Sequence, residues 1–344
     1  PVLRFAGFDQ FTVAEMRAKG IAVSSVVNNV SKDFEPEFVT AVDNNYAYVT
    51  IQEANAIGKL NIGTATFESI SRAFETKVSR VARDTSDRDA GAGPRTYTNV
   101  VAASQPDAIA GFTVGSGQYF VTANEGDARE YTCLNDDLRG SALKVDTRRF
   151  PNWSILSGSA ALGRAKVNPT IGDKDGDGDI DTIHLRGSNS MTMYRNGIAI
   201  WDSADLLDQI QTQAFGVANI NGSHSLSSDK STMNYVGQDR SDDKGAEPEG
   251  VAVGMVGDRR IAILGLERMT ALAIFDITVP GNPVFQEWLQ MLPTKATPAK
   301  DVKYWSPEGI VFVPANKSPS GKALIITSYE LSGSLSIHQI EPRN

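Results

Sequence analysis

Residues 247–267 read EPEGVAVGMVGDRRIAILGLE, and this stretch predicts a β-hairpin. Two apolar and β-branched runs, VAVGMV and IAILGL, flank a Gly257-Asp258 pair that can adopt the positive φ of a tight turn. The stretch opens with Pro248 and an acid, Glu249, and it closes with Glu267. We call this pattern of proline, acid, two strands and closing glutamate the hairpin phrase.

The chain contains the hairpin phrase four times. The other copies begin at Pro36-Glu37, Pro106-Asp107 and Pro307-Glu308, and they end at Glu53, Glu125 and Glu330. The prolines lie 70, 142 and 59 residues apart, and 142 is close to twice 70, which predicts a fifth, unmarked unit in the middle. Such units, rich in short strands, predict an all-β fold: a β-propeller with long loops and a few short helices, as a single domain over residues 1–344. The alternative is a β-sandwich in which the similarity is coincidental.

Composition and charge narrow the function classes. The chain has 344 residues, is 41% hydrophobic and carries a formal net charge of -8, which argues against a nucleic-acid partner and suits cation binding. Its single cysteine, Cys133, excludes an internal disulfide. No stretch of about 18 apolar residues occurs, so the sequence predicts no membrane span, and its first residues do not have the pattern expected of a signal peptide. The chain begins at Pro1, which predicts a processed or truncated start.

Short local signals place the remaining elements. Thr12 and Glu15 form a capping-box pattern before a short helix. A second short helix is expected from Asp205, and a hairpin is expected to turn at Asn196-Gly197. The last segment, SGSLSIHQIE, reads as a strand that could close a ring.

The sequence DKDGDGDID resembles a calcium-binding loop. Asp173, Asp175 and Asp177 occupy positions 1, 3 and 5 of an EF-hand-like loop, with Gly178 at the sharp turn. Asp179 offers its backbone carbonyl at position 7, and Asp181 falls at position 9. Position 12, normally Glu, is His184, so the site either lacks its bidentate ligand or receives one from another segment. The alternative to a structural calcium ion is a solvated acidic turn.

The acids of the four hairpin phrases form a second candidate site. Equivalent positions of propeller blades face a common axis, so these acids predict a ring of carboxylates at the channel mouth. The ring holds the strand-start acids Glu37, Asp107, Glu249 and Glu308 and the strand-end glutamates Glu53, Glu125, Glu267 and Glu330. Such a ring is costly unless a metal or arginine neutralises it, and Arg129, Arg240 and Arg268 lie near in sequence. The alternative is that each proline-acid pair caps its strand structurally.

Several long segments resemble the choice-of-anchor I proteins: EPEFVTAVDNNYAYVTIQEANAI, YTNVVAASQPDAIAGF, VTANEGDARE, GDKDGDGDID and DDKGAEPEGVAV. That family includes bacterial proteins described as alkaline-phosphatase-like and the animal mesenchyme-specific cell surface glycoprotein. The resemblance runs from about Leu3 to Ile340 and implies an exported propeller that is periplasmic, extracellular or held at the cell surface. Members usually carry about two further blades before the segment that matches Leu3. Either this chain is a shorter member, or it is a processed fragment with an N-terminal companion.

Together these features predict an exported calcium-binding propeller that acts as a metal-dependent phosphoester hydrolase on a small anionic substrate. Glu125 and Glu267 would hold a divalent ion, calcium or a second divalent or transition metal, that activates water. Arg129 or Arg268 would bind the phosphate oxygens. The alternative function is a non-catalytic surface or matrix protein that uses the same carboxylates to bind structural calcium.

Overall fold

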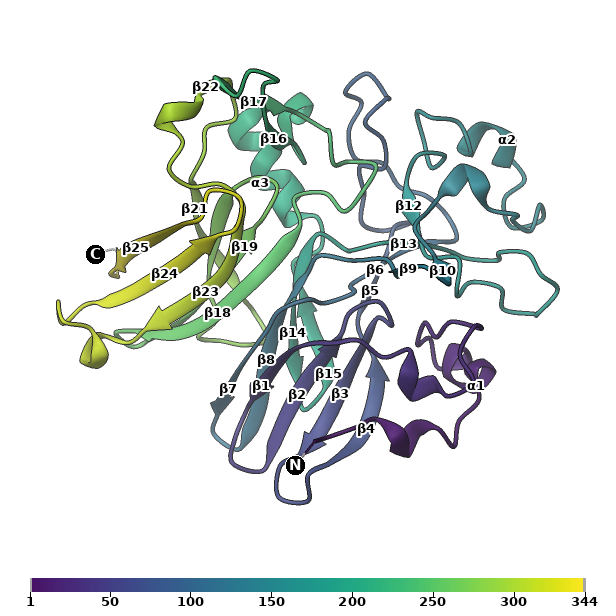
Figure 1. Ribbon diagram of the computed structural model, residues 1–344, viewed down its shortest axis with the longest axis horizontal. Coiled ribbons are helices and arrows are strands. Elements are labelled where there is room, and N and C mark those ends of the chain that lie inside the picture. Colours follow the sequence, from purple (N-terminus) through teal and green to yellow (C-terminus); the bar gives the residue numbers. More distant parts are fainter. Residues whose placement is uncertain (1, 343–344) are drawn as a thin grey trace.

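The computed structural model describes residues 2–342, and it shows four antiparallel sheets arranged one after another like the blades of a propeller (Figure 1). Blade 1 consists of β1 (Pro36–Ala41), β2 (Tyr46–Ile51), β3 (Ala56–Asn61) and β4 (Thr66–Arg72). Blade 2 consists of β7 (Ile109–Val114), β8 (Gly117–Asn124), β14 (Ser190–Arg195) and β15 (Ile198–Asp202). Blade 3 consists of β18 (Pro248–Val256), β19 (Arg259–Leu266), β20 (Ala271–Asp276) and β21 (Val284–Gln290). Blade 4 consists of β23 (Pro307–Val313), β24 (Ala323–Tyr329) and β25 (Ser334–Ile340).

Each hairpin phrase forms the first two strands of one blade. The first strands contact one another in series, β1 with β7, β7 with β18, and β18 with β23, so they are the inner strands of the array. The predicted fold class, an all-β propeller with long loops and a few short helices, is confirmed by this arrangement. The predicted turns are also present: Gly257 has a φ of +62°, and Asn196 and Gly197 have φ values of +51° and +82°.

The prediction of a fifth unit is wrong. Residues 125–189 are an insertion inside blade 2, between β8 and β14, which pair directly with Met193 opposite Val121. The 142-residue step is long because this insertion separates two paired strands, and the following segment adds a helix and a small sheet. Within residues 2–342, no further four-stranded meander lies between the second and third phrases.

The insertion contributes to a mixed five-stranded sheet beside blades 1 and 2, on the right of Figure 1. Its strands, in spatial order, are β11 (Leu138–Arg139), β12 (Lys166–Val167), β13 (Ile183–Leu185), β6 (Val100–Ala103) and β5 (Glu75–Lys77). The smaller sheets consist of β9 (Glu130–Tyr131) with β10 (Leu134–Asn135), and of β16 (Ser223–Leu226), β17 (Thr232–Val236) and β22 (Thr297–Pro298).

Helices are few and short, as expected. Helix α1 (Val13–Ala18) has the complete capping box, in which Thr12 and Glu15 satisfy each other's backbone amides. The others are α2 (Trp153–Leu156) and α3 (Leu206–Phe215), which begins after Asp205. The 3-10 helices are η1 (Ala6–Phe8), η2 (Val30–Lys32), η3 (Gly140–Ala142), η4 (Val217–Asn219), η5 (Ala299–Asp301) and η6 (Ala315–Lys317). In the described part of the chain, no helix is both long and apolar enough to cross a membrane.

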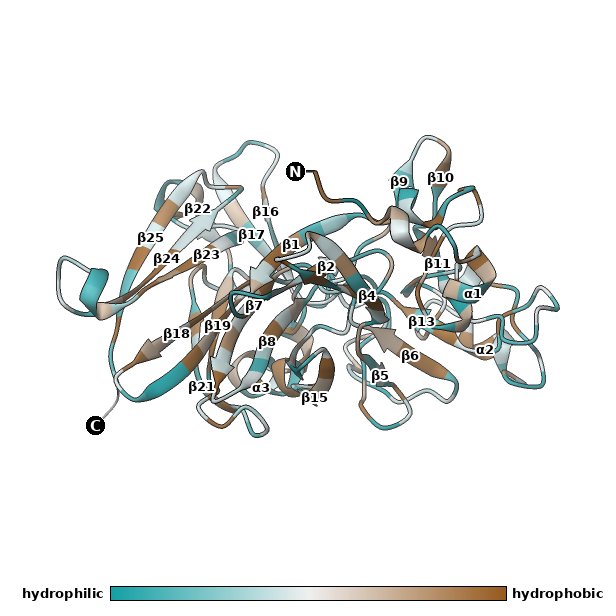
Figure 2. Ribbon diagram, turned by 90° about the horizontal axis from the view of Figure 1, so that it is seen from below, coloured by the Kyte–Doolittle hydropathy of each residue, from teal (hydrophilic) through white to brown (hydrophobic). Residues whose placement is uncertain are grey.

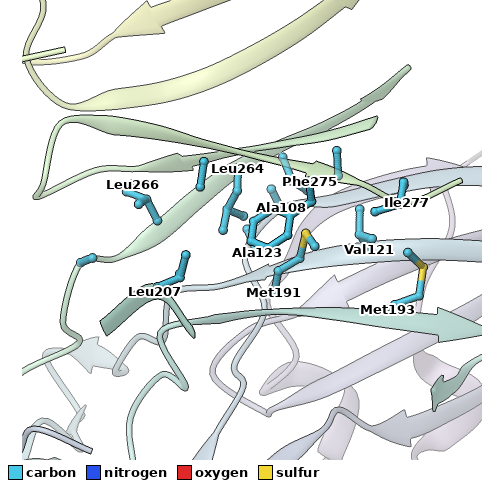
Figure 3. Packing of buried hydrophobic residues seen from close by; sticks show 14 of the residues in the cluster. Ala108, Val121, Ala123, Met191, Met193, Leu207, Leu264, Leu266, Phe275 and Ile277 are labelled. Carbon is cyan, nitrogen blue, oxygen red and sulfur yellow. The ribbon is translucent and has the colours of Figure 1, made fainter. Parts of the chain in front are cut away.

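The blades are held together by apolar layers between their faces. Between blades 2 and 3, Val121 and Met191 pack against Leu264 and Phe275, and all four side chains are completely buried (Figure 3). Hydrophobic residues concentrate in strands such as β2 and β18, whereas many of the long loops are hydrophilic (Figure 2). Burial of apolar surface at about 25 cal/mol per Å² makes these layers the main source of stability.

The last strand does not close a ring as the sequence suggested it could. Within the described residues β25 pairs only with β24, as the third strand of blade 4. Its register, with Ile337 opposite Ile326, fixes it as the outer strand of that blade.

Candidate functional site

An irregular backbone step begins most of the hairpin phrases. The residues before the prolines of the last three phrases, Gln105, Glu247 and Ser306, have φ values of +40°, +55° and +68°. Directly after Pro36, Pro248 and Pro307, the pairing with the next strand shifts register. Such bulges redirect side chains and are common beside functional sites. The strand-start acids of these three phrases therefore lie in a bulge, where they are not part of the regular in-out alternation.

The strand-end glutamates lie at the same end of each blade, because they follow the second strand of the hairpin. In the last two blades a backbone hydrogen bond joins this glutamate to the residue before the proline of the same phrase. The amide of Glu267 donates to the carbonyl of Glu247 over 2.8 Å, and the amide of Glu330 donates to the carbonyl of Ser306 over 2.9 Å. Each blade therefore presents two acids at one edge.

All eight phrase acids line one cavity of about 450 Å³, which we call the channel-mouth cavity. The other lining residues are Gln52, Asp127, Lys244 and Arg268. Asp107, Glu125 and Glu267 are buried at its inner part, whereas Glu37, Glu308 and Glu330 are exposed. Nine carboxylates thus face two basic groups in one small space.

Burial and mutual repulsion raise the pKa values of the inner acids. The pKa of Glu249 is raised to about 11, first by burial and then by the charges of Glu125 and Asp107. Burial also raises the pKa of Asp107 to about 8 and that of Glu53 to about 8, and neighbouring carboxylates add to both shifts. Glu267 has its pKa raised to about 7 for the same reasons, although Arg268 opposes the shift. The cavity therefore favours either protons or an added cation.

Two groups of three carboxylates at this cavity have the spacing of metal ligands, and all their members except Glu247, which is buried beside the cavity, line it. Oxygen atoms of Asp107, Glu125 and Glu249 all lie within 4.8 Å of one another, and so do those of Glu125, Glu247 and Glu267. We call them the first and the second carboxylate group. In the first, Asp107 is 5% exposed, and its Oδ2 atom has no hydrogen-bond partner among the described residues. Such purely oxygen-based groups suit hard cations such as calcium, magnesium or manganese.

Protein cations neutralise the second carboxylate group. Glu247 is completely buried. Its carboxylate oxygens form ion pairs with the guanidinium of Arg240 at 2.5 Å, the guanidinium of Arg268 at 3.0 Å and the ammonium of Lys244 at 3.5 Å. Burial alone would raise the pKa of Glu247, but these three charges lower it to about 2. Arg268 also lies 3.3 Å from Glu267, as the sequence suggested.

Lys244 and Glu247 are site residues that were not predicted from the sequence. The Lys244 ammonium lies 2.5 Å from Glu125 and 3.6 Å from Asp127. Lys244 is therefore the basic partner of Glu125, a role that the sequence had suggested for an arginine. A signal existed: the acid before the proline occurs in two of the four phrases, as Glu35 and Glu247, and a basic residue comes three positions before Glu247.

The role predicted for Arg129 is corrected by its position. Its side chain is completely buried, and it is absent from the cavity lining. Its guanidinium donates to the carbonyl of Ala22 over 2.8 Å and pairs with Asp33 at 2.9 Å and Asp136 at 3.5 Å. Arg129 therefore ties the N-terminal segment to the insertion and cannot reach a ligand in the cavity. Sequence proximity to Glu125 was misleading because the Arg129 side chain is directed to Ala22, Asp33 and Asp136 instead.

The Asp-rich loop forms a compact acidic turn. Asp173 accepts hydrogen bonds from the amides of Gly176 and Gly178, at 2.7 and 3.0 Å. Oxygen atoms of Asp173, Asp175 and Asp181 lie within 4.8 Å of one another. Asp177 and Asp179 are outside this group, which differs from the EF-hand pattern that the sequence suggested. His184, at the twelfth position, pairs instead with Glu75 on β5 at 3.3 Å.

Comparisons with known proteins agree with the sequence motifs. The model of the choice-of-anchor I domain matches residues 1–280. A mesenchyme-specific cell surface glycoprotein of Strongylocentrotus purpuratus is 24% identical over 232 residues, which cover 59% of this chain and 30% of that protein. The chain thus spans less than a third of that relative.

Similarity to solved structures is slight. A hydrazine synthase structure from Kuenenia stuttgartiensis gives a TM-score of 0.25 at 11% identity, over 89% of this chain and 84% of that one. The β-propeller domain of Myceliophteria thermophila Cps50 gives 0.18 at 9% identity, over 89% and 98%. The family match extends over most of the chain, including three of the four hairpin phrases, and the chain therefore belongs to the choice-of-anchor I family.

Proposed function

We propose that this protein is an exported surface propeller that binds a divalent cation in the channel-mouth cavity. The first carboxylate group carries the proposal. Asp107, Glu125 and Glu249 converge within 4.8 Å, and within residues 2–342 neither Asp107 nor Glu249 has a basic partner. Three carboxylates so close together are stable in ionised form only if a cation neutralises them. A divalent ion supplies that charge.

Calcium is the first expected occupant, and manganese or magnesium is the second. The donors are carboxylates alone, without the imidazole or thiolate groups that select zinc or copper. Asp107 Oδ2 lacks a hydrogen-bond partner and is ready to serve as a ligand. We also propose a separate structural calcium at Asp173, Asp175 and Asp181, because this turn has the spacing and the oxygen donors for it.

Similarity to a cell surface glycoprotein supports a location at the surface or outside the cell. Calcium concentrations there are high enough to saturate sites of modest affinity, such as those of extracellular modules at about 10⁻⁴–10⁻³ M. In this setting a cation bound by Asp107 and Glu125 of blade 2 and Glu249 of blade 3 would link these two neighbouring blades.

Hydrolysis of a phosphoester is a second candidate function, and one observation favours it. Glu125 belongs to both carboxylate groups, and a bridging carboxylate is what a pair of metal ions would share. Arg268, whose side chain is 35% exposed, could bind an anionic substrate at the rim. Against this candidate, protein cations already neutralise the second group.

Equilibrium dialysis with calcium and then manganese tests the proposal. The wild type should bind one ion that the Asp107→Asn variant loses, whereas Asp258→Asn, in an exposed turn of β18–β19, should bind as the wild type does. Equal binding by all three proteins would refute a site in the cavity. Assay of p-nitrophenyl phosphate with the same samples separates the two functions: turnover that is abolished by Asp107→Asn would establish the hydrolase.

A further inference from the structure

Lys244 lies where a second cation of the channel-mouth cavity would be expected. Its ammonium is 2.5 Å from Glu125 Oε1 and 3.5 Å from Glu247 Oε2, and its charge also acts on Glu267. These are the three members of the second carboxylate group. Its side chain is only 12% exposed, so the ammonium is held among these carboxylates and is not free in solvent.

The two carboxylate groups differ sharply in how much positive charge the protein supplies. Arg240, Arg268 and Lys244 all contact the second group, which contains three acids. Among the described residues, the first group is paired only with the Lys244 ammonium, through Glu125. The second oxygen of Glu125, Oε2, accepts a hydrogen bond from Gln52 over 2.8 Å.

We propose that the Lys244 ammonium occupies the second cation position of the cavity, so that the native protein binds one divalent ion there instead of two. This inference rests on the proposed function, because it assigns the single ion to Asp107, Glu125 and Glu249. Lys244 is then the residue that sets the metal stoichiometry. Without its charge, Glu125, Glu247 and Glu267 form a second divalent position that shares Glu125 with the first.

The reason is electrostatic and steric. The Lys244 ammonium already lies against Glu125 and Glu247, so a second divalent ion at this group would have to enter the same space and would be repelled by that charge. A flexible lysine stem brings a compact charge into the group, whereas a planar guanidinium would be directed by its fork geometry. Loop residues just before the third hairpin phrase place this stem over the cavity.

The experiment counts manganese ions bound in the cavity. The count is the number bound by a given protein minus the number bound by the same protein with Glu125→Gln, which removes the ligand common to both groups. This difference ignores the Asp-rich loop, which is unchanged. The wild type should give one, Lys244→Arg should give one, and Lys244→Met should give two. Two manganese ions that share a carboxylate should also broaden the electron paramagnetic resonance spectrum of Lys244→Met.

The outcomes separate this inference from the proposed function. A difference of zero for the wild type would refute the cation site itself. A difference of two for the wild type, or of one for a folded Lys244→Met, would refute the role of Lys244 while leaving the site intact. Circular dichroism checks folding, and if Lys244→Met does not fold, the wild-type count still decides between one ion and two.

Discussion

Replacing Glu53 by glutamine should stabilise the protein at neutral pH when no divalent ion is present. Glu53 is 5% exposed, lines the channel-mouth cavity, and its Oε2 atom has no hydrogen-bond partner among the described residues. Burial, and next the charge of Glu35, raise its pKa from 4.5 to about 8. Glutamine keeps the shape and cannot ionise.

The sign and size follow from linkage. A carboxyl group with a raised native pKa contributes its full stability below pH 4.5 and loses it as the pH rises toward 8. Each pH unit costs about 1.4 kcal/mol, so the wild type loses about 3 kcal/mol between pH 4.5 and pH 7 through this group. Glu53→Gln should therefore match the wild type at pH 4.5 and exceed it by about 3 kcal/mol at pH 7.

Urea unfolding in chelator at both pH values measures this difference. Glu330→Gln serves as the control, because Glu330 lines the same cavity but is exposed, and its change should stay within about 0.5 kcal/mol. Saturating calcium should narrow the advantage of Glu53→Gln, because a cation in the cavity stabilises nearby carboxylates. A variant no more stable than the wild type at pH 7 in chelator would refute the reasoning.

Three further changes test other parts of the structure. Glu247→Gln leaves three buried or half-buried cations without their shared anion and should lower the free energy of unfolding by about 3–5 kcal/mol in urea unfolding. Gly254→Ala places a methyl group against the Phe312 ring between blades 3 and 4, and it should lower the free energy of unfolding by about 1–3 kcal/mol in the same assay. Gly281→Ala, whose methyl group meets no atom within 4 Å, should leave the stability unchanged. Calcium bound to the Asp-rich loop should raise Tm, and at a calcium concentration 100 times Kd it should add about 2.7 kcal/mol to the free energy of unfolding. Asp173→Asn should abolish this contribution, as measured by differential scanning calorimetry.

The repeated hairpin phrases predicted the blades and the position of their acids well, because the signals are local. In three of the four phrases the proline and its acid mark the bulged start of an inner strand, and in all four the closing glutamate follows the second strand. The two-residue turns at Asn196-Gly197 and Gly257-Asp258 likewise depend only on residues that tolerate positive φ.

Long-range pairing could not be read from the sequence. Strands β8 and β14 are adjacent in blade 2 although the whole insertion separates them, and no local pattern marks that pairing. Arg129 and Lys244 show the same limit. Arg129 was judged by its neighbours in sequence and Lys244 was not singled out at all, yet Arg129 reaches Ala22 and Asp33, and Lys244 reaches Glu125 across the cavity. The basic partners of a buried acid are set by the tertiary fold.

An anomalous difference map from crystals of the wild-type protein grown with manganese tests the central claim most directly. We expect one strong peak at bonding distance from carboxylate oxygens of Asp107, Glu125 and Glu249, with the Lys244 ammonium still beside Glu125. The claim would be contradicted if manganese were bound elsewhere on the protein while the channel-mouth cavity showed no anomalous peak.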